Sequence, residues 1–226
     1  MKQTENIPEV LFKAREGDNE NLGGGCSIGG KWKDLTSNEL FKGKKVVLFS
    51  LPGAYTPTCS SQQLPGYEKK YEDLKKYVDE VYCLSVNDSF VMNAWFDSLA
   101  IEKVKSIADG NGDFTRHMGM LVKKEAVNFG YRSQRYSMVV DNGLVEMIFV
   151  EAGKEDNHAD DPFDVSDVDS MLTYLTGIRY VRREAIENAE KEAEENQTDE
   201  TETDISEWNW TKDKSYRFWF IRPPYR

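Results

Sequence analysis

Hydrophobic residues in the first half of the chain form short continuous runs separated by turn residues. The run Lys44–Ser50 ("KKVVLFS") is apolar and β-branched between Gly43 and Pro52, which predicts a buried strand. Glu80–Val86 ("EVYCLSV") predicts a second buried strand, and Val104–Gly110 ("VKSIADG") predicts a third strand that ends at a turn. We expect these three runs to be neighbouring strands of one sheet.

Between and after these runs the apolar spacing changes to three and four, which is typical of amphipathic helices. Cys59–Tyr77 follows this spacing, and Pro65 within it predicts a kink or a distorted second turn. Asn87–Ala100 opens with N-cap residues and continues as a predicted helix. A long helix is expected after Ser166 as its N-cap, and Thr36–Glu39 is a capping box for a short helical turn.

The segment Arg135–Glu151 predicts two strands joined at Asp141-Asn142-Gly143, a strong hairpin signal. Three strands alternating with helices, followed by a hairpin and a helix, indicate an α/β layer sandwich with a mixed sheet and helices on both faces. The first helix then begins at the carboxyl edge of its strand, where sites in such folds usually form. Cys59 lies at that point.

The net charge of −11 over 226 residues is unevenly placed. Residues 184–204 carry a net charge of −9 and residues 151–169 carry −7, so the rest of the chain is weakly basic. We therefore divide the chain into a domain at 1–183, an acidic helix end or linker at 184–204, and an aromatic-basic tail at 205–226. So many exposed aromatic side chains are a liability, which predicts that the tail docks on the body, a partner subunit or another protein.

Composition argues against several classes of function. No dense Lys/Arg face with interleaved aromatic residues is visible, so nucleic-acid binding is not expected. No apolar run is long enough to span a membrane, and the polar start shows no secretory signal. Three cysteines in such a chain predict free thiols and a cytoplasmic location.

Metal and phosphate chemistry is not expected either. The two histidines are His117 and His158, and the acidic residues around His158 lack the spacing of a calcium loop. The glycine cluster before Cys26 lacks the lysine of a phosphate-binding loop. So few histidines also disfavour a Cys–His hydrolase, although His117 stays open as a base.

Cys59 is the strongest candidate for chemistry. A cysteine reacts as its thiolate, and unpaired N–H groups in the first turn of a helix favour negative charge there. Thr56, three residues earlier, can direct its hydroxyl at the sulfur or at an oxygen bound beside it, and a nearby arginine would complete the activation. The alternative is a small buried residue without a chemical role.

Pro52–Cys59 ("PGAYTPTC") resembles the peroxiredoxin signature P-x-x-x-T/S-x-x-C. The resemblance covers about Pro8 to Leu175 and is similar to the peroxiredoxin-5 (plant type II) subfamily in the following further motifs: "VVLFSLPGAYTPTCSSQQLPGY", "CLSVNDSFVMNAW", "ADGNGDFTRHMGM" and "RYSMVVDNG". It implies a thioredoxin-like fold and the reduction of hydrogen peroxide and alkyl hydroperoxides, with no cofactor.

Residue by residue, the resemblance makes Cys59 the peroxidatic cysteine and Thr56 its hydroxyl partner. Pro52 matches the proline that shields the site, and Arg135 matches the active-site arginine, whose donors never deprotonate. Tyr55 stands where phenylalanine is common and keeps an aromatic wall. Attack on a peroxide then gives a sulfenic acid at Cys59.

The thiol that resolves this sulfenic acid stays open. Cys83 matches the resolving cysteine of the plant branch, but its place in a buried strand also fits an inert thiol. We expect its Cα to lie beyond the roughly 7 Å limit for a disulfide with Cys59, so bridging would require the first helical turn to unwind. Cys26 is either an exposed bystander or an intermolecular partner.

The resemblance further implies a hydroperoxide substrate and a reductant supplied in trans, either glutathione with glutaredoxin or thioredoxin. A homodimer is expected, with the tail as a strap across it. The alternative is a redox sensor or binding module, in which oxidised Cys59 signals to a partner through the tail.

Overall fold

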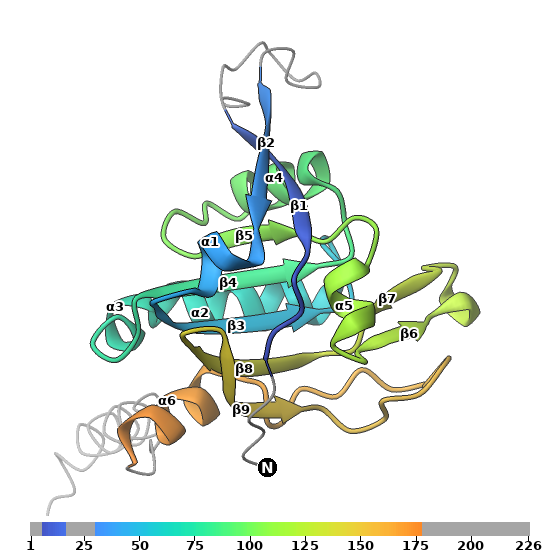
Figure 1. The fold of residues 1–226 in the computed structure, drawn as a ribbon. Coiled ribbons are helices and arrows are strands. Elements are labelled where there is room, and N and C mark those ends of the chain that lie inside the picture. The colour runs from blue at the N-terminus through green and yellow to red at the C-terminus, as the bar shows by residue number, and fades with distance from the viewer. Residues whose placement is uncertain (1–5, 17–29, 178–226) are drawn as a thin grey trace, which may run out of the picture. The chain divides into compact units, whose positions relative to one another are not determined.

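The structure is a computed structural model in which residues 6–16 and 30–177 are described (Figure 1). Its centre is a five-stranded sheet in which β3 pairs with β4 in parallel and with β8 antiparallel. In sheet order the strands are β5 (Lys105–Ala108), β4 (Glu80–Ser85), β3 (Lys45–Leu51), β8 (Tyr136–Asp141) and β9 (Leu144–Val150). The mixed sheet of a thioredoxin-like fold is thus confirmed.

Both faces of the sheet are buried, which explains the continuous apolar runs in the sequence. Because successive side chains in a strand point to opposite faces, β3 serves two separate cores. Val47 and Phe49 belong to one cluster, whereas Val46 and Leu48 belong to the other.

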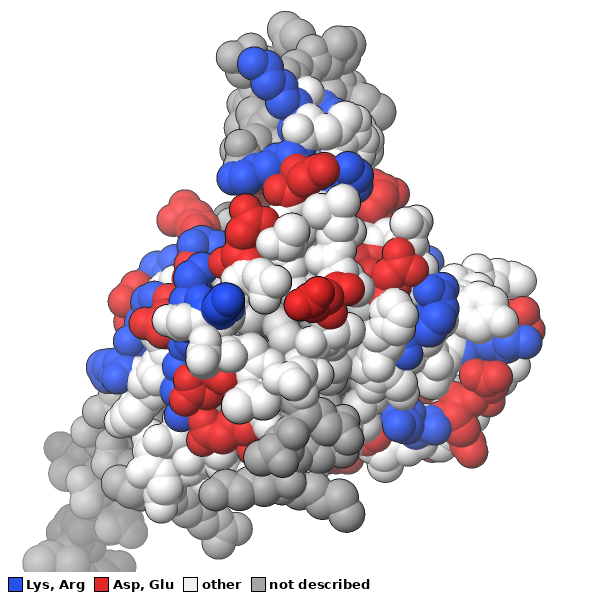
Figure 2. Space-filling view, viewed as in Figure 1, with Lys and Arg blue, Asp and Glu red and all other residues white. Residues whose placement is uncertain are grey.

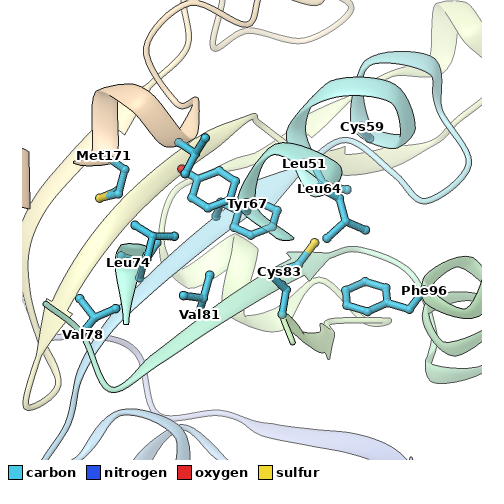
Figure 3. Close-up of a cluster of buried hydrophobic side chains, with 14 of the residues drawn as sticks. Leu51, Cys59, Leu64, Tyr67, Leu74, Val78, Val81, Cys83, Phe96 and Met171 are labelled. Carbon is cyan, nitrogen blue, oxygen red and sulfur yellow. The ribbon is translucent and has the colours of Figure 1, made fainter. Parts of the chain in front are cut away.

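Helices cover the two faces as predicted (Figure 1). The face of Val47 packs against α2 (Leu64–Lys69), α3 (Tyr71–Leu74), α4 (Ser89–Ser98) and α6 (Val168–Thr176). The opposite face packs against β1 (Leu11–Glu16), α1 (Ser37–Phe41) and α5 (Asp113–His117). In the first cluster, drawn in Figure 3, Tyr67 stacks on Phe49 with ring centroids 4.0 Å apart. This stacking fixes α2, and with it the start of the preceding helical segment, against the sheet.

Local signals at the element ends are confirmed in three places. The predicted hairpin forms between β8 and β9, and its two loop residues, Asn142 (φ 48°) and Gly143 (φ 83°), both have the positive φ that a tight hairpin turn requires. Thr36 and Glu39 form the predicted capping box of α1. Asp88 caps α4 by accepting hydrogen bonds from two backbone N–H groups.

The predicted single helix Cys59–Tyr77 is wrong, because this stretch forms three segments. It begins with a π-helical turn, η1 (Cys59–Gln63), continues as α2, breaks at Lys70 (φ −101°, ψ 14°) and ends with α3. Pro65 lies in the first turn of α2, and the predicted distortion is present as the π-helical turn. Proline lacks an N–H for a bond to the preceding turn, and the widened π turn occurs directly before it.

Two boundaries around α6 also differ from the prediction. The N-cap is Asp167 and not Ser166, because the Ser166 hydroxyl donates to Glu151 instead. α6 ends at Thr176, where Gly177 adopts a left-handed conformation (φ 66°), so the helix is shorter than expected. The predicted linker and tail lie outside the described residues, as does Cys26.

Two antiparallel ribbons flank the main sheet. β1 pairs with β2 (Lys31–Thr36), and β6 (Leu121–Lys123) pairs with β7 (Tyr131–Ser133) around the 3-10 turn η2 (Glu125–Val127). The pattern analysis missed β6, β7 and α5, because segments of three to five residues are too short to establish a period. β7 ends at Ser133, two residues before Arg135.

The surface carries charges of both signs. On the face shown in Figure 2, basic and acidic side chains are interspersed and form no large basic patch. Within the described residues, no helix combines the length and apolar character needed to cross a bilayer. The same part of the chain holds no cluster of three His, Cys, Asp or Glu side chains suited to a metal ion.

The carboxylate of Glu151 fixes the segment that leads into α6. Glu151 is 3% exposed, and its oxygens accept from the backbone N–H groups of Asp164, Val165 and Ser166 and from the Ser166 hydroxyl at 2.7–3.0 Å. Burial by itself raises the pKa of Glu151, but these hydrogen bonds together outweigh it and lower the pKa below its usual 4.5. The charged form is therefore favoured by folding.

We predict that Glu151→Gln lowers the free energy of unfolding by about 2 kcal/mol at pH 7, because a buried charge-assisted cluster is lost. A lowered folded-state pKa contributes stability above the unfolded value, and this contribution disappears as the pH falls through the folded value. Urea unfolding between pH 7 and pH 3 should show the difference from wild type shrinking below the usual pKa of 4.5. Exposed Glu125→Gln is the control, and a pH-independent difference for Glu151→Gln would contradict the assignment.

Candidate active site

The loop after β3 brings the chain to the candidate cysteine. Pro52 is buried at its start, and the Asn87 side chain holds the loop by accepting from the Ala54 N–H at 3.0 Å. Ser85 at the end of β4 donates to the same Asn87 oxygen at 2.7 Å, which ties the loop to the sheet edge. Tyr55 has a positive φ of 59° and is 58% exposed, so its ring lies at the surface beside the loop.

Cys59 lies in the first turn of the helix that follows this loop, as predicted. Helical backbone begins at Pro57, and the Ser60 N–H donates to the Thr56 carbonyl at 3.0 Å. N–H groups in a first turn have no carbonyl partner within their helix and point toward its start. Cys59 is nevertheless 0% exposed, so its sulfur contacts other protein groups and not bulk water.

The Thr56 hydroxyl is close to this turn but does not hydrogen-bond the sulfur. It donates to the Gly53 carbonyl at 2.8 Å. With its proton committed there, the Thr56 oxygen is left as an acceptor. The sequence left two roles open for this hydroxyl, and the geometry favours contact with a molecule bound beside Cys59.

Arg135, between β7 and β8, reaches Cys59 from 76 positions along the chain. Its Nη1 lies 3.4 Å from Cys59 Sγ and 2.5 Å from the Gln63 side-chain oxygen. Arg135 is only 2% exposed. Burial alone lowers the pKa of Arg135, but the neighbouring Cys59 sulfur and Asp161 carboxylate outweigh it and raise the pKa above its ordinary value. The guanidinium is therefore a permanent cation in contact with the sulfur.

Two residues of the site, Gln63 and Asp161, were missed from the sequence. Gln63 is fully buried at the end of the π-helical turn that begins with Cys59. Both oxygens of Asp161 lie 2.5 Å from Arg135 Nη2, and the Phe163 ring centroid lies 5.6 Å from the guanidinium carbon. Gln63 could have been predicted, because a polar residue four places after Cys59 lies on the same face of a helix. No feature of the neighbouring sequence indicates a role for Asp161.

Two buried donors in this cluster have no acceptor among the described residues: Nε of Arg135 and Nε2 of Gln63. Buried polar groups are normally hydrogen-bonded. Together with the acceptor on Thr56, they offer the complementary hydrogen-bonding groups that an –O–OH group requires. The arrangement can hold a thiolate and a small oxygen-rich molecule side by side.

Cys83 lies on β4 and is free and fully buried in the same cluster as Cys59. Burial raises the pKa of Cys83 well above its usual value, and the Cys59 sulfur adds to the shift. Figure 3 shows Cys59 on the helical segment and Cys83 on β4, with Leu64 between them in this view. These features fit an inert thiol in the state described, and the resolving role stays a prediction.

Comparisons with known proteins agree with this geometry. The redoxin family model matches residues 27–172. A peroxiredoxin of Synechocystis sp. is 52% identical over 174 residues, covering 76% of this chain and 90% of the relative. Peroxiredoxin-2B of Arabidopsis thaliana is 43% identical over 140 residues, covering 61% and 82%.

Among solved structures, reduced Prx3 of Vibrio vulnificus in complex with H₂O₂ is similar, with a TM-score of 0.64 and 37% identity. The match covers 78% of this chain and 96% of that one. The chain therefore belongs to the redoxin family and is a peroxiredoxin, a thiol-dependent peroxidase, of a type II-like subfamily.

Proposed function

We propose that this peroxiredoxin reduces hydrogen peroxide and alkyl hydroperoxides at Cys59. The Cys59 thiolate attacks one oxygen of the substrate, the O–O bond breaks, and the leaving oxygen takes a proton to become water or an alcohol. Cys59 is left as a sulfenic acid. One external thiol then forms a mixed disulfide with Cys59 with loss of water, and a second thiol attacks it, which releases Cys59 as its thiol and the two external thiols as a disulfide.

The observation that carries this proposal is the 3.4 Å contact between Arg135 Nη1 and Cys59 Sγ in a buried site. A guanidinium stabilises a thiolate and also the negative charge that develops on the leaving oxygen. Its unpaired Nε–H can donate a hydrogen bond to that oxygen, and the Thr56 oxygen can accept a hydrogen bond from the hydroperoxide O–H. The H₂O₂ bound to the related Vibrio vulnificus protein supports this choice of substrate.

We also propose that an external thiol, supplied in trans by glutathione with glutaredoxin or by thioredoxin, attacks the Cys59 sulfenic acid directly. Support comes from Cys83, which is fully buried and has a strongly raised pKa, so it is a poor nucleophile in the folded state. An internal Cys59–Cys83 disulfide remains the competing route. The sensor alternative depends on the tail, which lies outside the described residues, and the predicted cytoplasmic location stays a prediction.

Cys59→Ser should abolish peroxide turnover, by at least about 10³-fold, because a hydroxyl cannot replace the thiolate as a nucleophile.

Cys83→Ser should still form the Cys59 sulfenic acid in one turnover and accept glutathione there. Peptide mapping after one equivalent of peroxide, with and without glutathione, checks this. A wild-type protein that yields only a Cys59–Cys83 bridge would refute the external route and leave the peroxidase activity intact.

Arg135→Lys should lower kcat/KM for hydrogen peroxide by about 10²-fold, since lysine keeps the charge but loses the fork that serves Cys59, Gln63 and Asp161 together. Stopped-flow oxidation of Cys59 gives the rate constant. Exposed Arg116→Lys is the matched control and should retain the wild-type rate. An unchanged rate in a folded Arg135→Lys protein would remove the guanidinium from the reaction.

We further propose a homodimer in which residues 205–226 form a strap between protomers. Large apolar side chains exposed on the active-site loop and on the β6–β7 ribbon support an interface there, namely Tyr55, Val127, Phe129 and Tyr131. Sedimentation of the full chain should give twice the monomer mass, whereas the protein lacking residues 205–226 should sediment as a monomer and melt at a lower temperature. A truncated protein that remains a dimer with an unchanged melting temperature would count against the strap.

A further inference from the structure

The Asp161 carboxylate occupies the outer edge of the Arg135 guanidinium. Of the five N–H groups of Arg135, those on Nη1 serve Cys59 and Gln63, and those on Nη2 serve the two oxygens of Asp161. The remaining Nε–H is buried. No pair of adjacent N–H groups is therefore left for a second carboxylate to bind in bidentate fashion.

The residues that follow Asp161 in the sequence help to position its side chain beside Arg135. Asp161 precedes Pro162, and a residue before proline favours an extended conformation, in which side chains two positions apart lie on the same side. Both contact Arg135, one through its charge and the other through its ring. The Glu151 carboxylate fixes the backbone of the next three residues. Asp161 is thus held in position by its ion pair with Arg135 and by the residues that follow it in the chain.

Exposure differs sharply across this pair. The side chain of Asp161 is 46% exposed, whereas that of Arg135 is 2% exposed. From this side, an approaching molecule meets the carboxylate before it meets the guanidinium. A negative charge separated from the sulfur by one guanidinium repels other anions that come to Cys59, and a partly buried charge is screened less than a fully exposed one.

We propose that Asp161 is a specificity-determining residue that favours uncharged hydroperoxides over hydroperoxides that carry a carboxylate. The inference rests on the proposed peroxidase function. Sulfur attack and O–O cleavage follow the same steps for both substrates, with the same electrons transferred. The difference therefore arises from binding near Asp161 and Arg135 and not from the chemistry of the bond that breaks.

Two analogues of cumene hydroperoxide test the inference, one with a para-carboxamide and one with a para-carboxylate, which have similar shapes and differ by one charge. Single-turnover oxidation of Cys59, followed by stopped flow at 0.15 M salt and pH 7, needs no reductant. Wild type should react faster with the carboxamide by about five- to tenfold, the size expected for one nearby like charge that salt screens only in part. In Asp161→Asn this ratio should fall to about one or below.

Matched variants separate charge from structure. Asp160→Asn removes the same charge from the adjacent position, which is exposed and makes no ion pair with any described residue, and should keep the wild-type ratio. Asp161→Glu keeps the charge and should retain the discrimination. A purely structural role for Asp161 would slow both analogues equally and leave the ratio unchanged in Asp161→Asn, which would overturn the inference.

The outcomes also separate this inference from the proposed function. If neither analogue nor hydrogen peroxide oxidises Cys59 in the wild-type protein, the peroxidase proposal fails. If it reacts with both analogues at equal rates, the peroxidase proposal stands and the role of Asp161 is refuted. An equal change of ratio in Asp160→Asn and Asp161→Asn would assign the effect to general surface charge and refute the specific role as well.

Discussion

The buried guanidinium of Arg135 is the constraint on which the site depends. A cation that is 2% exposed is strongly unfavourable unless charges and hydrogen-bond acceptors surround it. Two segments supply the partners of this side chain. Cys59 and Gln63 come from the helix start, and Asp161 and Phe163 come from the segment before α6. The same contacts that make burial tolerable also aim Nη1 at the sulfur. Stability and chemistry therefore depend on one geometry.

The backbone around Arg135 is as closely tied as its side chain. The Glu151 N–H donates to the Arg135 carbonyl at 3.1 Å, and the Glu151 carboxylate holds residues 164–166. The side chain of Asp161, just before those residues, returns to the Arg135 guanidinium. Glu151 therefore contacts the Arg135 backbone directly, and through residues 164–166 it also holds the segment that carries Asp161. A change at Glu151 is expected to affect the site as well as the fold, although Glu151 contacts no reacting atom.

The π-helical turn at the start of the helix links local sequence to this arrangement. Its closing hydrogen bond runs from the Leu64 N–H to the Cys59 carbonyl, which places Cys59 and Gln63 at opposite ends of one wide turn. Gln63 contacts Nη1 of Arg135 next to Cys59. Pro65, which cannot donate to the preceding turn, sets the point where the wide turn gives way to α2. Such turns often occur at functional sites, and here the turn lets two side chains share one guanidinium nitrogen.

The sequence by itself determined the strands of the central sheet, the β8–β9 turn, two helix caps and the position of the candidate cysteine at a helix start, because each follows from the spacing of neighbouring residues or from a short motif. Only the tertiary structure decided that Arg135 contacts Gln63, 72 positions away, and Asp161, 26 positions away. It also decided that the Thr56 hydroxyl turns to Gly53 and that the helix divides into three segments. The physical reason is that side-chain charge and hydrogen bonding act across whatever surfaces the fold brings together, and the spacing of residues along one segment carries no record of the partner supplied by another.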